Sequence, residues 1–81
     1  MKAFIVLNEK AKPIAATTDE AIAMDVLFNL ALQEGRVDEE RGTFDFGDST
    51  ILDTDLETLR ESNLLTGEEM DQLEEAGAVL I

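Results

Sequence analysis

The chain has 81 residues, is 44% hydrophobic and carries a formal net charge of −13 at pH 7. This length predicts one domain over residues 1–81 that buries about 60% of its unfolded surface, and the hydrophobic content argues against disorder despite the charge. The sequence contains neither cysteine nor histidine, which excludes disulfides, thiolate metal sites and catalysis by histidine.

The first predicted elements are two strands joined by a polar turn. Residues 3–7 form a continuous apolar run, which predicts a buried strand because the run is too short for a helix, a signal peptide or a membrane span. Residues 14–16 should form a second strand at an edge of the sheet, because Pro13 has no N–H to donate. We expect a cytoplasmic protein.

The longest predicted element is a helix from Thr17 to Gly35. Thr17 and Glu20 have the spacing of a capping box, and Gly35 lies where a left-handed residue commonly ends a helix. Apolar side chains cover most of the circumference and leave one polar stripe, formed by Asp25, Asn29 and Gln33. We expect the helix to be embedded between two layers of its own domain; the alternative is that one flank binds another subunit.

A second hairpin is predicted after this helix. Residues 36–42 are highly charged and should form an exposed connection. Residues 43–46 alternate between polar and aromatic, and residues 47–49 supply turn chemistry before residues 50–52, so these two segments should pair with each other.

Two short helices and a last strand complete the predicted order. Capping-box spacings at Thr54–Glu57 and Thr66–Glu69 begin the helices. The first should end near Asn63, and Gly77 should end the second, whose buried stripe is Met70, Leu73 and Ala76. Residues 78–81 are aliphatic and should pair with residues 3–7. The predicted fold is α+β, with a mostly antiparallel sheet of four or five strands on one long central helix and the two short C-terminal helices on the other flank.

The acidity belongs to the second half of the chain. Residues 1–33 hold four acids and three lysines, a net charge of −1, whereas residues 34–75 hold fifteen acids and three arginines, a net charge of −12. Such an excess disfavours direct binding to nucleic acid, and it matches the phosphate charge of roughly 20 Å of duplex. The acids expected to contact a partner are Asp45, Asp48, Asp53, Asp55, Glu57, Glu61, Glu68, Asp71 and Glu75.

Other chemistry has weaker support. Asp45, Asp48, Asp53, Asp55 and Glu57 are hard-cation ligand types, but their spacing does not fit a calcium-binding helix–loop–helix motif. A catalytic pair of acids needs a cleft that the sequence does not indicate. The glycines do not cluster into a phosphate-binding loop. We therefore expect no enzyme activity, no cofactor and no specific metal site, with solvated turn and cap residues as the competing interpretation of these acids.

In size and charge the chain resembles the small acidic phage-encoded inhibitors that mimic DNA, including many anti-CRISPR proteins. The resemblance lies in the shortness of the chain, the carboxylate-dense run from Asp45 to Glu61 and the later acids of residues 68–75. It implies a non-enzymatic inhibitor, active in the host cytoplasm, that binds the basic groove of a nucleic-acid-handling complex such as a CRISPR-type defence complex.

Two interpretations without a basic partner remain open. The acids can serve solubility or salt adaptation alone, since acidic side chains are common on helix surfaces and in first turns. The chain would then be a structural or adaptor subunit that associates through apolar surface, with a homodimer as one form. In that case the broad apolar circumference of the predicted helix would be the functional surface.

Overall fold

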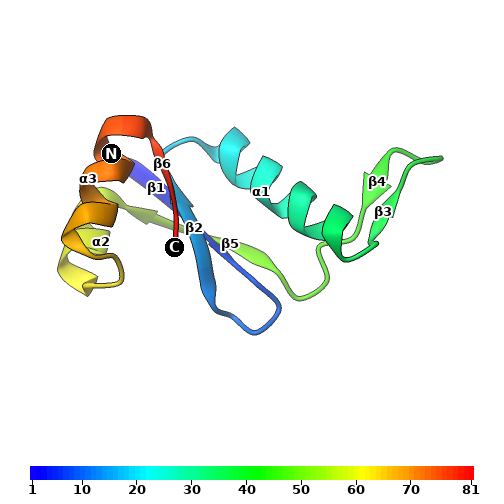
Figure 1. Ribbon diagram of the computed structural model, residues 1–81, viewed down its shortest axis with the longest axis horizontal. Helices are drawn as coiled ribbons and strands as arrows, with labels where there is room; N and C mark the ends of the chain where they lie inside the picture. The colour runs from blue at the N-terminus through cyan, green and yellow to red at the C-terminus, as the bar shows by residue number, and fades with distance from the viewer.

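A computed structural model describes residues 1–81 and contains one four-stranded sheet with helices on both faces (Figure 1). The elements follow the order β1 (Lys2–Leu7), β2 (Pro13–Thr17), α1 (Glu20–Gln33), β3 (Val37–Asp38), β4 (Thr43–Phe44), β5 (Thr50–Asp55), α2 (Leu56–Ser62), α3 (Gly67–Ala76) and β6 (Ala78–Leu80). The sheet order is β5-β1-β2-β6, every neighbouring pair is antiparallel, and β3 and β4 form a separate hairpin. The α+β class is confirmed.

Strand β1 lies at the centre of the sheet and is buried on both faces. Because side chains alternate along a strand, Phe4 and Val6 face α1, whereas Ala3 and Ile5 face α2 and α3. All four residues are at most 8% exposed. Burial on both faces explains why this strand is a continuous apolar run rather than an alternating one.

Each face of the sheet has its own apolar core. On the α1 side the buried residues are Phe4, Val6, Ala15, Ala23 and Leu27. On the α2–α3 side they are Ala3, Ile5, Ala16, Leu59, Leu65, Met70, Leu73 and Val79. The prediction of one long, embedded central helix is wrong, because α1 has only 14 residues and covers one face. Its opposite side is open, and Met24, Phe28 and Leu32 are 37–50% exposed.

Helix α1 begins at Asp19 rather than at Thr17. The Asp19 carboxylate accepts a hydrogen bond from the Ala21 N–H at 2.9 Å and caps the helix. Thr17 cannot act as the cap because it lies in β2. Its hydroxyl donates to the Gly77 carbonyl at 2.6 Å and accepts from the Asp19 N–H at 3.1 Å. The predicted end is confirmed, since Gly35 has a φ of +72°.

Strand β2 is an internal strand, which corrects the predicted edge position. It pairs with β1 on one side and with β6 on the other. The pairing changes register at Ile14, because Val6 lies opposite Ala15 and Leu7 lies opposite Pro13. This extra residue is a β-bulge and places Ile14 beside the α1-side core. Because β6 pairs with β2 and not with β1, the prediction that residues 78–81 pair with residues 3–7 is wrong.

The predicted hairpin between residues 43–46 and 50–52 does not form. Residues 43–44 pair instead with residues 37–38, and β5 joins the main sheet beside β1. The six-residue register of β5 against β1 explains this choice, because it satisfies far more backbone groups than a two-residue hairpin. Phe44 anchors the β3–β4 hairpin through edge-on contacts with Phe28 and Phe46.

The predicted exposed connection after α1 also contains a largely buried arginine. The Arg36 side chain is 16% exposed and lies 2.7 Å from the Glu34 carboxylate and 3.6 Å from the Glu9 carboxylate. It also donates to the Asp45 carbonyl at 2.6 Å. Arg36 thus ties the hairpin to the end of α1 and to the turn after β1.

One of the three predicted capping boxes is confirmed. At α3 the Thr66 hydroxyl accepts from the Glu69 N–H, and the Glu69 carboxylate accepts from the Thr66 N–H. At α2 the cap is Asp55, because Thr54 is held in β5. The predicted ends at Asn63 and Gly77 are confirmed by φ values of +57° and +79°. Ala76 is exposed and is not part of the buried stripe.

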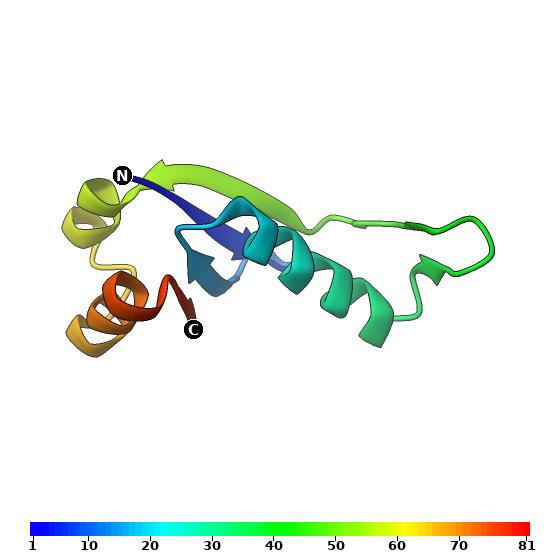
Figure 2. The same cartoon turned by 90° about the horizontal axis from the view of Figure 1, so that it is seen from above.

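The whole molecule is elongated, with extents of 41, 23 and 18 Å. Figure 2 shows the reason, since the β3–β4 hairpin projects beyond the sheet at one end while α2 and α3 lie at the other. Strand β5 runs between these two ends along one side of the sheet.

Candidate functional site

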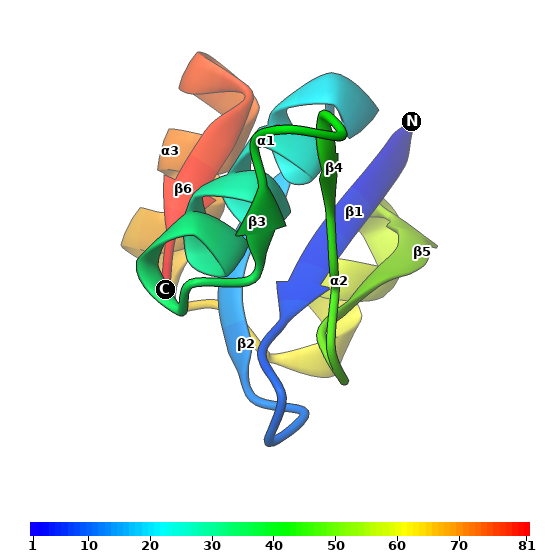
Figure 3. The same ribbon diagram turned by 90° about the vertical axis from the view of Figure 1, so that its right-hand side faces the viewer.

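The nine acids predicted to contact a partner follow one path along the molecule. Asp45 and Asp48 lie in the loop between β4 and β5, Asp53 lies in β5, and Asp55 caps α2. Glu57 and Glu61 are on α2, and the remaining three, Glu68, Asp71 and Glu75, are on α3. Asp55 is half-buried and the other eight are exposed. The path runs from the hairpin end to the end that holds α2 and α3 (Figures 1 and 2), so the structure spreads these acids over the length of the molecule. Figure 3 looks along this length, with the β3–β4 hairpin toward the viewer.

None of these nine carboxylates takes part in an ion pair. The three arginines of the second half pair with other acids: Arg36 with Glu9 and Glu34, Arg41 with Asp38, and Arg60 with Glu74. The Arg60–Glu74 pair joins α2 to α3. The positive charge of this half is therefore already neutralised, and the predicted site keeps its full negative charge.

Two of the nine acids have local structural roles. The Asp45 carboxylate accepts from the Gly47 N–H at 2.8 Å, and the Asp55 carboxylate accepts from the Thr58 N–H at 2.8 Å. The bonds donated by Thr58 lower the pKa of Asp55 below its ordinary value. The other seven make no side-chain hydrogen bond within the protein: Asp48, Asp53, Glu57, Glu61, Glu68, Asp71 and Glu75.

The acids do not converge on a point. No group of three or more acidic side chains lies close enough together to hold a metal ion. The pKa of Asp55 is lowered, whereas a general acid needs a raised pKa. The arrangement is suited to electrostatic contact over an extended surface.

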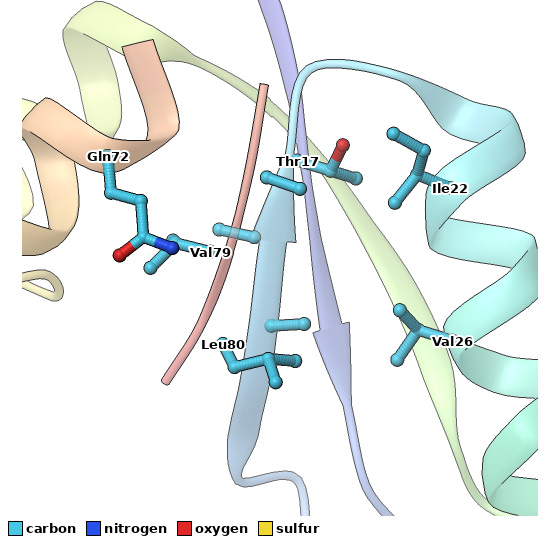
Figure 4. Close-up of a pocket in the computed structure, with 9 residues that line it drawn as sticks. Thr17, Ile22, Val26, Gln72, Val79 and Leu80 are labelled. Carbon is cyan, nitrogen blue, oxygen red and sulfur yellow. The ribbon is translucent and has the colours of Figure 1, made fainter. Parts of the chain in front are cut away.

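A second surface, which the sequence did not single out, is an uncharged groove between α1 and β6. We call this the α1–β6 groove; it comprises two adjoining hollows of about 190 and 270 Å³. Figure 4 shows Ile22 and Val26 of α1 facing Thr17 and Leu80 across it. No charged residue lines either hollow. Leu80 is 77% exposed, so the groove is an open apolar surface in a highly charged protein.

The groove was partly detectable in the sequence. In the sequence alone, the broad apolar circumference of α1 favours an embedded helix, with one flank that binds another subunit as the alternative. Ile22, Val26 and Leu30 line the groove at i, i+4 and i+8. The position of Leu80 opposite this flank depends on the pairing of β6 with β2. That pairing has no local signal in the sequence.

No helix of the structure is both long enough and apolar enough to span a membrane. No protein-family model, curated protein or solved structure matches the chain.

Proposed function

We propose that this chain is a non-enzymatic interaction domain whose acidic path binds a basic surface of a nucleic-acid-handling protein, in place of nucleic acid. One observation carries the proposal: nine accessible carboxylates follow one another along the molecule, and none is neutralised by an ion pair. An unpaired charge on a surface remains available to a partner, whereas a paired one is already compensated.

The charge spacing suggests the kind of groove that would accept the protein. A net charge of −13 along 41 Å corresponds to about one negative charge per 3 Å. A duplex carries one charge roughly every 1.7 Å of its axis, and each of its two strands carries one roughly every 3.4 Å. The linear charge density of the protein is therefore comparable with that of one strand of a duplex and about half that of the whole duplex. The concrete partner is a protein or complex with a basic nucleic-acid-binding groove, including those of phage-defence systems.

The experiment compares two variants of equal charge. In the site variant Asp53, Glu57, Glu61 and Glu68 are changed to the corresponding amides. In the control variant Glu20, Asp25, Glu39 and Glu40 are changed in the same way. Both variants have a net charge of −9, and none of these eight side chains makes a hydrogen bond or ion pair in the protein.

Host-lysate proteins are captured with wild type, the site variant and the control variant, and the captured proteins are challenged with an excess of duplex or single-stranded oligonucleotide. We expect wild type and control to retain a nucleic-acid-binding protein that the oligonucleotide displaces. The site variant should bind it at least about fivefold more weakly, since exposed charge pairs contribute roughly 0.2–1 kcal/mol each. Equal binding by the site and control variants, or no displacement by oligonucleotide, would contradict the proposal.

The adaptor function remains a second candidate because of the α1–β6 groove. An adaptor that associates through this groove would dimerise more strongly as salt screens the repulsion between two copies. Light scattering at low and high salt tests this: a salt-strengthened dimer that Leu80→Asp abolishes supports the adaptor, and a monomer at every concentration rejects it.

A further inference from the structure

Strand β5 is an open edge of the sheet, and its unpaired backbone groups can be assigned. The Leu56 N–H donates to the Met1 carbonyl at 3.0 Å, and this bond continues the register between β5 and β1. In an antiparallel ladder, hydrogen-bonded and non-hydrogen-bonded pairs alternate. Thr50, Leu52 and Thr54 therefore bond to β1. The N–H and C=O groups of Ile51 and Asp53 point away from the sheet and have no partner.

This edge is accessible, and of the features that usually protect edge strands it has only charged side chains, those of Asp53 and Asp55. Figure 2 shows β5 along one side of the molecule with no element beyond it. Its six residues, TILDTD, contain no proline and no lysine, and its register with β1 has no bulge. Natural edge strands are commonly blocked by such features. The opposite edge, β6, has only three residues, and α3 packs beside it.

The side chains of β5 present a different chemistry on each face. Ile51, Asp53 and Asp55 lie on the α1 side, because their partners on β1 include Phe4 and Val6. Leu52 lies on the other side and is 50% exposed.

Asp53 is the free carboxylate of this edge. Asp55 is occupied by the cap of α2 and lies opposite Lys2. Asp53 lies opposite Phe4 and makes no hydrogen bond or ion pair through its side chain. A strand added to β5 would therefore meet one uncompensated negative charge directly across the ladder.

The charge also excludes a second copy of the chain as the added strand. Pairing β5 with β5 of another copy would bring Asp53 and Asp55 of both copies onto one face of the joined sheet, and like charges across a ladder are destabilising. A basic strand would place a positive side chain across from Asp53, and opposite charges across a ladder are stabilising.

We propose that β5 binds an extended basic segment of the partner as a fifth strand of the sheet. This inference rests on the proposed function, because it assumes a basic partner, and it specifies how that partner is held. The segment hydrogen-bonds to Ile51 and Asp53 through its backbone. It carries lysine or arginine opposite Asp53 and an aliphatic side chain on the face of Leu52. The acids of α2 continue beyond the end of β5 and attract the remaining basic residues of the segment.

The test uses an eight-residue peptide of alternating lysine and valine with blocked ends. The control peptide has the same sequence with methyl groups on the four lysine amide nitrogens, which face β5 when the lysines lie on the side of Asp53. Methylation keeps the charge and removes the backbone donors. Two lost hydrogen bonds should weaken binding roughly tenfold. In the complex with the unmethylated peptide, the Ile51 and Asp53 amides should exchange their hydrogens much more slowly than in the free protein.

Two variants separate the backbone from the charge. Asp53→Asn removes only the charge and should weaken binding of the unmethylated peptide about two- to fivefold. Asp53→Pro also removes the outward N–H, which an edge strand tolerates, and should weaken it further. Correct folding of each variant is checked by slow hydrogen exchange at the Leu52 amide, whose N–H bonds to β1 in both variants.

The inference is overturned if the two peptides bind equally, if the unmethylated peptide does not bind at low salt, or if the Ile51 and Asp53 amides exchange as fast in the complex as in the free protein. The proposed function is judged separately, by the capture of host protein with the site and control variants. If both peptides bind equally and the site variant fails to capture the host protein, the acidic path remains the proposed binding surface and only the added strand is rejected.

Discussion

Replacing Thr17 with valine tests the connection between the start of α1 and the junction of α3 and β6. Thr17 is 1% exposed, and its hydroxyl bridges the Gly77 carbonyl at 2.6 Å and the Asp19 N–H at 3.1 Å. It thereby ties the start of α1 to the junction between α3 and β6. Valine has nearly the same shape, so Thr17→Val removes both hydrogen bonds without opening a cavity.

The expected cost follows from the partners that lose a bond. The Gly77 carbonyl still accepts from the Thr18 N–H at 3.0 Å, and Asp19 is exposed, so water can replace its lost acceptor. Each lost bond then costs about 1 kcal/mol, and the sum of about 2 kcal/mol lowers the melting temperature by roughly 8–16 °C in a domain of this size.

Thermal denaturation followed by circular dichroism measures this effect. Thr17→Ser keeps the hydroxyl and loses one buried methyl group, so it should cost only about 1 kcal/mol. Thr50→Val, at an exposed position of β5, should stay within about 0.5 kcal/mol of wild type. A valine variant at position 17 as stable as Thr50→Val, or more stable than Thr17→Ser, would refute the structural role of the hydroxyl.

Two further predictions concern local contacts. Asp55 has a lowered pKa in the folded state because Thr58 donates to its carboxylate, so its stabilising contribution is present above the ordinary aspartate pKa and is lost as the pH falls through the lower folded value. The stability difference between wild type and Asp55→Asn should therefore be largest near neutral pH and shrink below about pH 4, as denaturation at several pH values would show. Gly47 has a φ of +61°, and a Cβ there would lie 2.6 Å from both the Arg36 Nη1 and the Glu9 Oε1 atoms. Gly47→Ala should destabilise the hairpin by about 1–2 kcal/mol and accelerate hydrogen exchange at residues 37–46, whereas unchanged exchange there would contradict the contact.

Local sequence signals predicted the elements whose causes are local. The capping box at Thr66, the left-handed ends at Gly35, Asn63 and Gly77, and the buried strand at residues 3–7 are all confirmed. Each depends on residues within one or two turns of the chain. The same reasoning failed at Thr17 and Thr54, because strand pairing with distant residues holds both threonines in extended conformation and moves each cap to the following aspartate.

The candidate site was likewise only partly predictable from the sequence. The exposure of eight of the nine acids was predictable, because carboxylates are rarely buried without partners. Their freedom from ion pairs was not, since Arg60 reaches Glu74 only through the approach of α2 to α3, and Arg36 reaches Glu9 only because the turn after β1 lies beside the end of α1. The α1–β6 groove and the open edge at β5 likewise depend on the strand order.

By itself, the sequence determined a small acidic α+β chain, the location of its charge in the second half and most helix ends. Composition and local backbone preference suffice for these. Only the tertiary structure decided that the sheet runs β5-β1-β2-β6, which leaves β5 open on one side and an uncharged groove beside β6 on the other. Strand order is set by which apolar faces and backbone groups satisfy each other across the whole chain, and no local segment carries that information.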